Sequence, residues 1–209
     1  NQAAVGDAVF TVENDIDFDA SAAVDTTNGI TITAAGNAAG STLTGTDQGD
    51  NITGGNSNDT ITGGDGADSL DAGNGDDKLI FTNNLQLGND NTVIGGGGTD
   101  TIAFTTAIDT LNGSGNFHAD FSKVHSVEQI SLFGSSLVNL GDQLPGAGVN
   151  TIVTGNGDTT LRYDNTDLGT INVDASLLVD NGMLTLTEFG VTGPGHWFDV
   201  ETLKADVNA

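Results

Sequence analysis

Four aspartates recur every nine residues in this chain, and their type and spacing are the clearest sign of chemistry. They are Asp50, Asp59, Asp68 and Asp77. Asp is a short carboxylate that favours turns, and a hard cation such as Ca²⁺ requires several such oxygen ligands around one point. Mg²⁺ fits less well because it needs tighter octahedral geometry, and Zn²⁺ prefers His and Cys. The spacing therefore predicts oxygen-ligated calcium sites.

These aspartates are the sixth residues of a nine-residue repeat. From Gly45 the chain reads GTDQGDNIT, GGNSNDTIT, GGDGADSLD and AGNGDDKLI without a gap, and the eighth residues are Ile52, Ile61, Leu70 and Leu79. The glycines permit positive φ and a tight turn, and the end of each unit predicts a short strand with its aliphatic side chain inward. Two units then make one coil. The expected fold is all-β, a parallel β-roll or β-solenoid with calcium-binding nonapeptide turns.

Units of equal parity stack on the same side of such a coil. Asp50 is therefore expected beside Asp68, and Asp59 beside Asp77, with turn oxygens completing each site. Asp100, in the later unit GGGGTDTIA, is expected to serve a separate site. The oxygen demand of each ion predicts roughly three to five ions. The candidate metal ligands are Asp50, Asp59, Asp68, Asp77, Asp100, Gly54, Asn56, Gly63, Asp65, Gly73 and Asn74.

The repeat weakens at both ends. A degenerate unit, GNAAGSTLT, precedes Gly45 in the same register, and after a break at 81–85 a weak unit, QLGNDNTVI, follows. Ser41 and Asn91 stand where the ligand Asp is expected. Glycine is also replaced inside the strong run, by Thr46 at the second position and by Gln48 and Ser57 at the fourth.

The composition favours bound cations. The chain carries 29 Asp and Glu against 4 Lys and Arg, a formal net charge of −25, and all but four of the acids are Asp. Such a charge opposes compaction unless cations balance it, and it argues against nucleic acid as a partner. One aliphatic side chain per nine residues, at about 1.5–3 kcal/mol each, is a thin core against about 1–2 kcal/mol of backbone entropy per residue. We therefore expect calcium binding and folding to be coupled.

The run GGNSNDTIT-GGDGADSLD-AGNGDDKLI resembles the RTX (repeats-in-toxin) calcium-binding family. The resemblance covers residues 36–103 at most and is strong over 45–80. It implies a parallel β-roll, an extracellular or cell-surface location, and export by type I secretion as a calcium-free, unfolded chain. The segment FSKVHSVEQISL resembles those that follow RTX blocks in large adhesins and surface-layer proteins.

The flanks are expected to be β-rich as well. Residues 1–35 form an N-terminal β cap, residues 36–103 the β-roll, and residues 104–209 a calcium-poor β-domain or a continuation of the solenoid. Alternating apolar residues predict strands, and DVETLKADV predicts a short C-terminal helix. The expected strands are Ala8–Val12, Ile30–Thr33, Val127–Phe133, Asn150–Gly155, Thr160–Tyr163, Gly169–Ala175 and Gly182–Gly190.

No catalytic motif can be assembled, so the chain is not expected to be an enzyme. The three histidines, His118, His125 and His196, do not form HExxH, and Ser114 is not in a GxSxG elbow. Asp164 begins an EF-hand-like run that lacks its later ligands. The chain has no Cys and no apolar stretch long enough to span a membrane.

Three functions remain open at this stage. The first is a secreted structural or adhesive protein, such as a surface-layer, biofilm-matrix or filament subunit, that folds and self-associates on binding calcium. The second is the C-terminal secretion or folding module of a secreted hydrolase such as a protease or lipase. The third is a ligand-binding adhesin domain that holds sugar or ice. For the third, the threonines that recur every nine residues are better explained by strand propensity.

Overall fold

The nine-residue units fold into short parallel strands joined by tight turns. The computed structural model describes residues 8–13, 17–23, 28–36, 38–108, 121–140, 144–164, 171–178, 182–189 and 200–205. These residues form two compact units, each described by itself: unit 1 comprises residues 1–81, 89–102 and 123–127, and unit 2 comprises 82–88, 103–122 and 128–209. The predicted all-β parallel β-solenoid, with about six turns, is confirmed.

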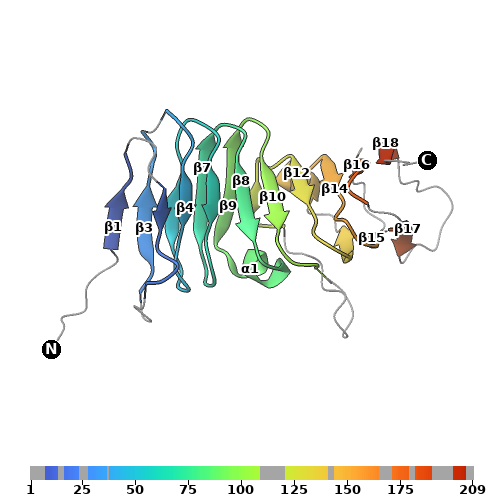
Figure 1. The fold of residues 1–209 in the computed structure, drawn as a ribbon, viewed down its shortest axis with the longest axis horizontal. Helices are drawn as coiled ribbons and strands as arrows, with labels where there is room; N and C mark the ends of the chain where they lie inside the picture. The colour runs from blue at the N-terminus through green and yellow to red at the C-terminus, as the bar shows by residue number, and fades with distance from the viewer. Residues whose placement is uncertain are drawn as a thin grey trace. The chain divides into compact units, whose positions relative to one another are not determined.

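In unit 1, alternate strands belong to two sheets, as two half-coils per turn require. One sheet has the order β1-β3-β5-β7-β9-β11, and β2, β4, β6 and β8 are successive neighbours in the other. Figure 1 shows β1 and β3 as arrows that point the same way, and β8 of the other sheet as an arrow that points the opposite way. The bounds are β1 Ala8–Thr11, β2 Phe18–Asp19, β3 Ile30–Thr33, β4 Thr42–Thr44, β5 Asn51–Thr53, β6 Thr60–Thr62, β7 Ser69–Asn74, β8 Lys78–Phe81, β9 Thr92–Gly97, β10 Thr101–Phe104 and β11 Val124–His125.

The core of unit 1 is a pair of aliphatic ladders. Ile52 pairs with Leu70 in one sheet and Ile61 with Leu79 in the other, and all four side chains are fully buried. Each is the second residue of its strand, and alternation turns that residue inward while its neighbours face outward. The N-terminal strands lie on the same ladders, since Ile32 pairs with Ile52. The predicted inward set is confirmed.

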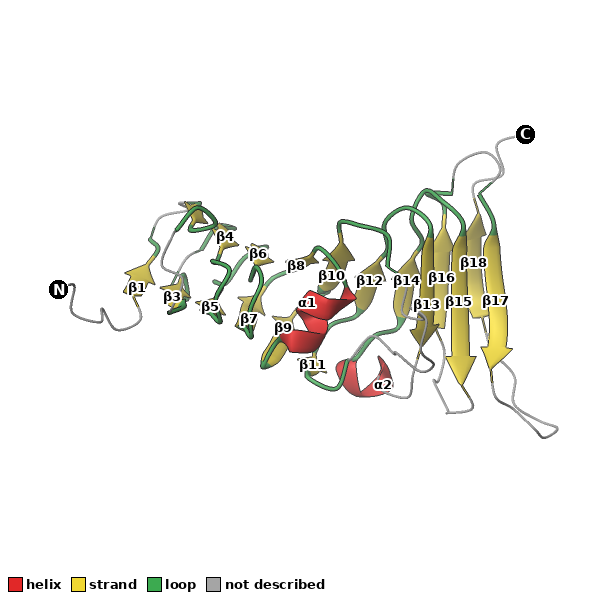
Figure 2. Cartoon of the chain, turned by 90° about the horizontal axis from the view of Figure 1, so that it is seen from below, coloured by secondary structure: helices red, strands yellow, loops and turns green. Residues whose placement is uncertain are grey.

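Unit 2 is also built of parallel strands that alternate between two sheets, which makes it a solenoid. β12, β14, β16 and β18 are successive neighbours in one sheet, and β13, β15 and β17 form the other. In Figure 2, β15 and β17 lie side by side and point the same way. The bounds are β12 Gln129–Ser131, β13 Ser136–Leu140, β14 Thr151–Val153, β15 Thr159–Asp164, β16 Ile171–Ala175, β17 Leu184–Phe189 and β18 Val200–Ala205.

Each strand predicted in the flanks is present, with bounds that differ by a few residues at the ends. The predicted C-terminal helix is wrong, because β18 pairs in parallel with β16 over the described part of that tail. Pairing with a strand distant in the sequence overrides the favourable helix propensity of Leu203 and Lys204. Two short helices were not predicted, α1 (Asn84–Asn89) and α2 (Leu144–Ala147). None of the helices that the structure describes is long and apolar enough to cross a membrane.

Candidate metal centre

The predicted Asp ligands form two buried columns in unit 1. The first Asp column runs through Asp50, Asp68 and Asp90, and the second through Ser41, Asp59, Asp77 and Asp100. Within each column the backbone N–H of one member donates to the carboxylate Oδ1 of the member in the next coil. The donor–acceptor distances are 2.8 Å for Asp50 to Asp68, 3.1 Å for Asp68 to Asp90, 2.6 Å for Ser41 to Asp59, 2.7 Å for Asp59 to Asp77, and 2.9 Å for Asp77 to Asp100.

All six carboxylates are at most 3% exposed, so they lie inside the coil and not on its surface. The predicted parity is confirmed, since Asp50 lies beside Asp68 and Asp59 beside Asp77. Where a unit begins with glycine, that residue makes room for the unit's own Asp. A Cβ added at Gly63 would overlap the Asp68 carboxylate, and one added at Gly54 would lie 2.7 Å from Asp59 Oδ2. These units therefore couple a missing side chain at position one to a buried carboxylate at position six, whereas the unit of Asp77 begins with Ala72.

Asp100 lies beside Asp77 in the second Asp column, and its service of a separate ion site stays a prediction. The spacing from Asp77 is 23 residues in place of 18, yet the two remain adjacent in the second Asp column. The extra residues are absorbed by α1, which falls in the weak unit that follows Phe81. The helix lengthens the coil and leaves both ladders in register, because Leu70 still pairs with Val93.

Asp90 is a column member that the sequence reasoning missed. In the repeat register the sixth position of its unit is Asn91, but Asn91 is exposed and Asp90 is 1% exposed. The Asn91 side chain instead donates to the Ala67 carbonyl at 2.7 Å. Because α1 ends at Asn89, the chain enters the coil one residue earlier, and the preceding acid takes the buried place. The available signal was an Asp directly before Asn91, which occupies the expected ligand position.

The turns that carry the columns fall into two kinds. In the turns that begin at Gly63, Ala72 and Gly95, the second and fourth residues are glycines with positive φ, namely Gly64, Gly66, Gly73, Gly75, Gly96 and Gly98. We call these glycine-complete turns. The turns that begin at Gly45 and Gly54 contain no residue with positive φ, and Gln48 and Ser57 hold their fourth positions. The glycine replacements noted in the sequence therefore change the backbone of the turn.

The two kinds of turn leave their carboxylates in different states. In the turn at Gly45, Asp50 Oδ2 accepts the Thr46 N–H at 2.6 Å, and the Thr46 hydroxyl lies 3.1 Å from both carboxylate oxygens. In the turn at Gly54, Asp59 Oδ2 accepts the Gly55 N–H at 2.5 Å. By contrast, Oδ2 of Asp77, in the glycine-complete turn at Ala72, is buried without a hydrogen-bond partner. The same holds for Oδ2 of Asp90, which follows α1 and belongs to neither kind of turn. A buried anionic oxygen left in that state is costly unless a cation binds it.

Burial disfavours the charged form of these carboxyls and so raises their pKa. Removal from water raises the pKa of Asp68 to about 7, and the charges of Asp50 and Asp65 add to the effect. Burial also raises the pKa of Asp77 to about 6, with Asp100, Asp59 and Asp76 contributing. In each case a backbone N–H donated by the column neighbour opposes the rise. The protein alone thus disfavours the charged form, and a bound cation would favour it.

Turn carbonyls supply the other oxygens that an ion would need. The Gly73 and Gly75 carbonyls face Gly96 and Gly98 of the next turn in the second column, so closely that a Cβ on either glycine would overlap them. Among the residues that the structure describes, no three His, Cys, Asp or Glu side chains gather closely enough to hold an ion by themselves. A calcium ion at a column carboxylate would therefore need further oxygens such as turn carbonyls, which make an all-oxygen set that Ca²⁺ prefers.

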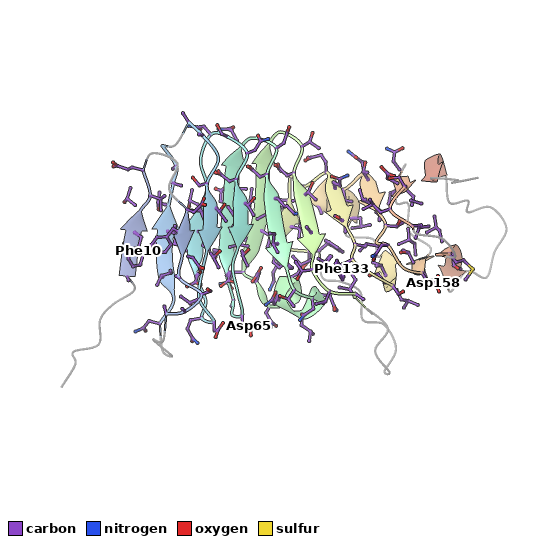
Figure 3. All side chains as sticks on the ribbon, in the orientation of Figure 1. Phe10, Asp65, Phe133 and Asp158 are labelled. Carbon is purple, nitrogen blue, oxygen red and sulfur yellow. The ribbon has the colours of Figure 1, made fainter. Side chains whose placement is uncertain are left out.

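The remaining predicted ligands lie at the outer ends of the turns. Asn56, Asp65 and Asn74 are exposed, and Figure 3 shows Asp65 at the end of its turn. The Asn74 side-chain amide donates to Asn56 Oδ1 at 3.1 Å, which links successive turns of the second column. Gly54 and Gly63 are buried beside the columns, and Gly73 is half-buried. His125 is exposed on β11, whereas Ser114, His118 and His196 lie outside the described residues.

Fold and site together define a class: a parallel β-roll whose glycine turns enclose ladders of buried Asp suited to calcium. The family model of the RTX calcium-binding nonapeptide repeat matches this chain in four copies, over residues 44–79 and 87–111. The matched residues are therefore RTX calcium-binding nonapeptide repeats, as the resemblance to that family predicted. No curated protein and no solved structure shows significant similarity to the chain.

Proposed function

We propose that this RTX β-roll is an extracellular structural or adhesive protein that folds and self-associates on binding calcium, and that it is not an enzyme. The observation that carries the proposal is Oδ2 of Asp77, a buried carboxylate oxygen that has no hydrogen-bond partner. Millimolar calcium is found outside cells, and extracellular calcium modules bind at about 10⁻⁴–10⁻³ M. Such a chain remains unfolded until it meets that concentration.

Self-association is supported by the first strand of unit 1. β1 is the outermost strand of its sheet, and Val9 on it is 69% exposed. Phe10, on the same strand, is 38% exposed and stacks at 4.7 Å, between ring centroids, on Phe18 of β2 (Figure 3). An exposed edge strand with apolar side chains is a template for pairing with another chain. We propose a second copy or a matrix component as the partner.

The test is a calcium titration followed by far-UV circular dichroism and light scattering on the same samples, with Mg²⁺ as the comparison ion. We expect strand signal to rise between about 10⁻⁴ and 10⁻³ M calcium and particle mass to rise after it. Asp77→Asn should raise the calcium midpoint roughly tenfold, which corresponds to about 1.4 kcal/mol. Asp71→Asn removes the same charge from an exposed position on β7 and should leave the midpoint within about twofold of wild type.

Each outcome decides between the functions considered. Strand signal followed by growth in mass supports a self-associating structural protein. Strand signal with a constant monomer mass favours the folding or secretion module of a larger hydrolase and overturns the structural proposal. A midpoint that Asp77→Asn and Asp71→Asn shift equally would remove the second Asp column from the calcium site.

A further inference from the structure

Lys123 reaches the end of the first Asp column. It is one of only four Lys and Arg residues in the chain. Its side chain is half-buried, and its Nζ donates a hydrogen bond to the Asp90 carbonyl oxygen at 2.6 Å. Lys123 immediately precedes β11, whose Val124 pairs with Val93, and the Val93 N–H donates to the Lys123 carbonyl at 3.0 Å. Lys123 therefore belongs to the coil that follows Asp90.

Asp90 needs positive charge at this place. Its Oδ1 accepts the Asp68 N–H, while its Oδ2 is buried without a hydrogen-bond partner. The Lys123 charge interacts favourably with the Asp90 carboxylate. One ammonium group thus acts on both a turn carbonyl and a column carboxylate, the two kinds of oxygen that would bind calcium elsewhere in unit 1.

Of the next coil, the structure describes residues 121–125 before the following turn. These residues, FSKVH, contain neither the paired glycines nor the Asp of the repeat. Calcium takes six to eight oxygen ligands, and one turn alone supplies too few. An ammonium group needs only a few acceptors, and its chain of methylenes carries it there from the neighbouring coil.

We propose that Lys123 is a built-in cation that closes the first Asp column in place of a calcium ion. The inference rests on the proposed calcium-dependent folding, because it says where the series of ions ends. It also explains why the column can stop at Asp90 without a further glycine-complete turn. The second column has no such lysine among the described residues, so Asp77 depends on calcium.

The experiment is a double-mutant cycle in the full chain, with the calcium midpoint of the circular dichroism transition as the readout. Lys123→Met keeps the length of the side chain and removes its charge. Lys78→Met is the matched control, because Lys78 is exposed on β8 of the same unit. We expect Lys123→Met to raise the midpoint about two- to fivefold, since a hydrogen bond from a charged group is lost and the loss is shared among several ions. Lys78→Met should change it by less than about 1.5-fold.

The second arm is Asp90→Asn, alone and combined with Lys123→Met. If Lys123 neutralises Asp90, Lys123→Met should shift the midpoint much less once Asp90 is Asn. Lys123→Arg should remain within about twofold of wild type, because the charge is retained. If Lys123→Met fails to fold and the double variant folds, the coupling is supported. Equal midpoints for Lys123→Met and Lys78→Met, or a double variant no better than Lys123→Met, would overturn it.

Failure of the proposed function gives a different result. In that case wild type shows no calcium-dependent transition, whatever the variants do. The same cycle is then followed by urea unfolding without calcium. A lower urea midpoint for Lys123→Met than for Lys78→Met, cancelled by Asp90→Asn, would support the role of Lys123 as a fixed cation; no difference would reject it.

Discussion

Units 1 and 2 share a parallel coil but place different polar groups inside it. In unit 1 the buried polar residues are mainly carboxylates, the six aspartates of the two columns. Among the described residues of unit 2 they are the hydroxyls of Ser136, Thr154 and Thr159. A hydroxyl can be buried with one hydrogen bond, whereas a carboxylate needs charge balance as well. The comparison shows that one backbone architecture can be stable in itself or dependent on ions, according to the residue at the inner end of the turn.

Two of these three buried hydroxyls of unit 2 have hydrogen-bond partners close to them. Ser136 Oγ donates to the Phe133 carbonyl at 2.9 Å and accepts the Ile108 N–H at 3.2 Å. Thr159 Oγ1 donates to the Gly157 carbonyl at 3.4 Å, whereas Thr154 Oγ1 is buried without a hydrogen-bond partner. In unit 1 the buried groups are carboxylates that repel one another. The buried groups of unit 2 are neutral, so they need no charge balance from an ion.

Removal of calcium should produce the largest difference in stability between the two units. With a chelator present, amides of β5 to β9 should lose protection in hydrogen–deuterium exchange mass spectrometry, because their columns lose the charge balance that permits burial. Amides of β14 and β16 should keep theirs. Equal loss of protection in both units would show that they fold as one cooperative body, and no loss in unit 1 would show that its columns need no ion.

The second largest effect should come from Gly64→Ala. Gly64 has φ of +110°, and an added Cβ would overlap the Thr46 carbonyl of the preceding turn. Strain in this region costs about 1–3 kcal/mol, and the overlap adds to it. Gly36→Ala is the matched control, because nothing lies within 4 Å of its added Cβ. Urea unfolding at saturating calcium should show the loss for Gly64→Ala alone, and equal loss in both variants would contradict the role assigned to the glycine-complete turns.

A change of pH should alter the stability of unit 1 through its column carboxyls more than that of unit 2. The folded-state pKa of Asp68 and Asp90 is about 7 and that of Asp77 about 6, above the usual value of 3.8. Between pH about 4 and 7 the folded state then binds more protons than the unfolded state, so stability without calcium rises as pH falls through this window. Calcium should bind more weakly at the acid end, because protons compete for the same oxygens. Chelated samples at pH 5 and pH 8 test this by thermal melting, and a lower melting temperature at pH 5 would contradict it.

The sequence predicts unit 1 well because one local rule repeats there. Each unit links a glycine turn, an inward carboxylate and an inward aliphatic residue, so the period alone gives the fold, the pairing of Asp50 with Asp68, and the buried Ile52. The rule fails where a non-repeating insertion enters. Nothing in the nine-residue pattern predicts that α1 shifts the register by one residue, so Asp90 is missed and the adjacency of Asp100 to Asp77 is not foreseen.

Unit 2 is harder to predict because its strands carry no such link. Alternation identifies the strands, but solenoid and packed β-domain have the same pattern, and only the parallel register of β14 with β16 distinguishes them. The helix expected at the C-terminus fails for the same reason, since the parallel partner of Leu203 is Val173, far away in the sequence. The role of Lys123 could not be predicted from the sequence, because it depends on a contact between neighbouring coils.

The smallest expected effect comes from replacing a threonine by valine in each of the two units. Thr159→Val removes a buried hydroxyl that bonds a neighbouring carbonyl, and should cost about 0.5–1.5 kcal/mol while leaving the calcium midpoint unchanged. Thr46→Val removes the hydroxyl that lies 3.1 Å from both Asp50 oxygens, so a bond to a charged group is lost and the calcium midpoint should rise. Urea unfolding and the calcium titration measure the two quantities separately. If Thr159→Val also moves the calcium midpoint, the stability of unit 2 is linked to the ions of unit 1, and the contrast between a self-sufficient and an ion-dependent solenoid does not hold.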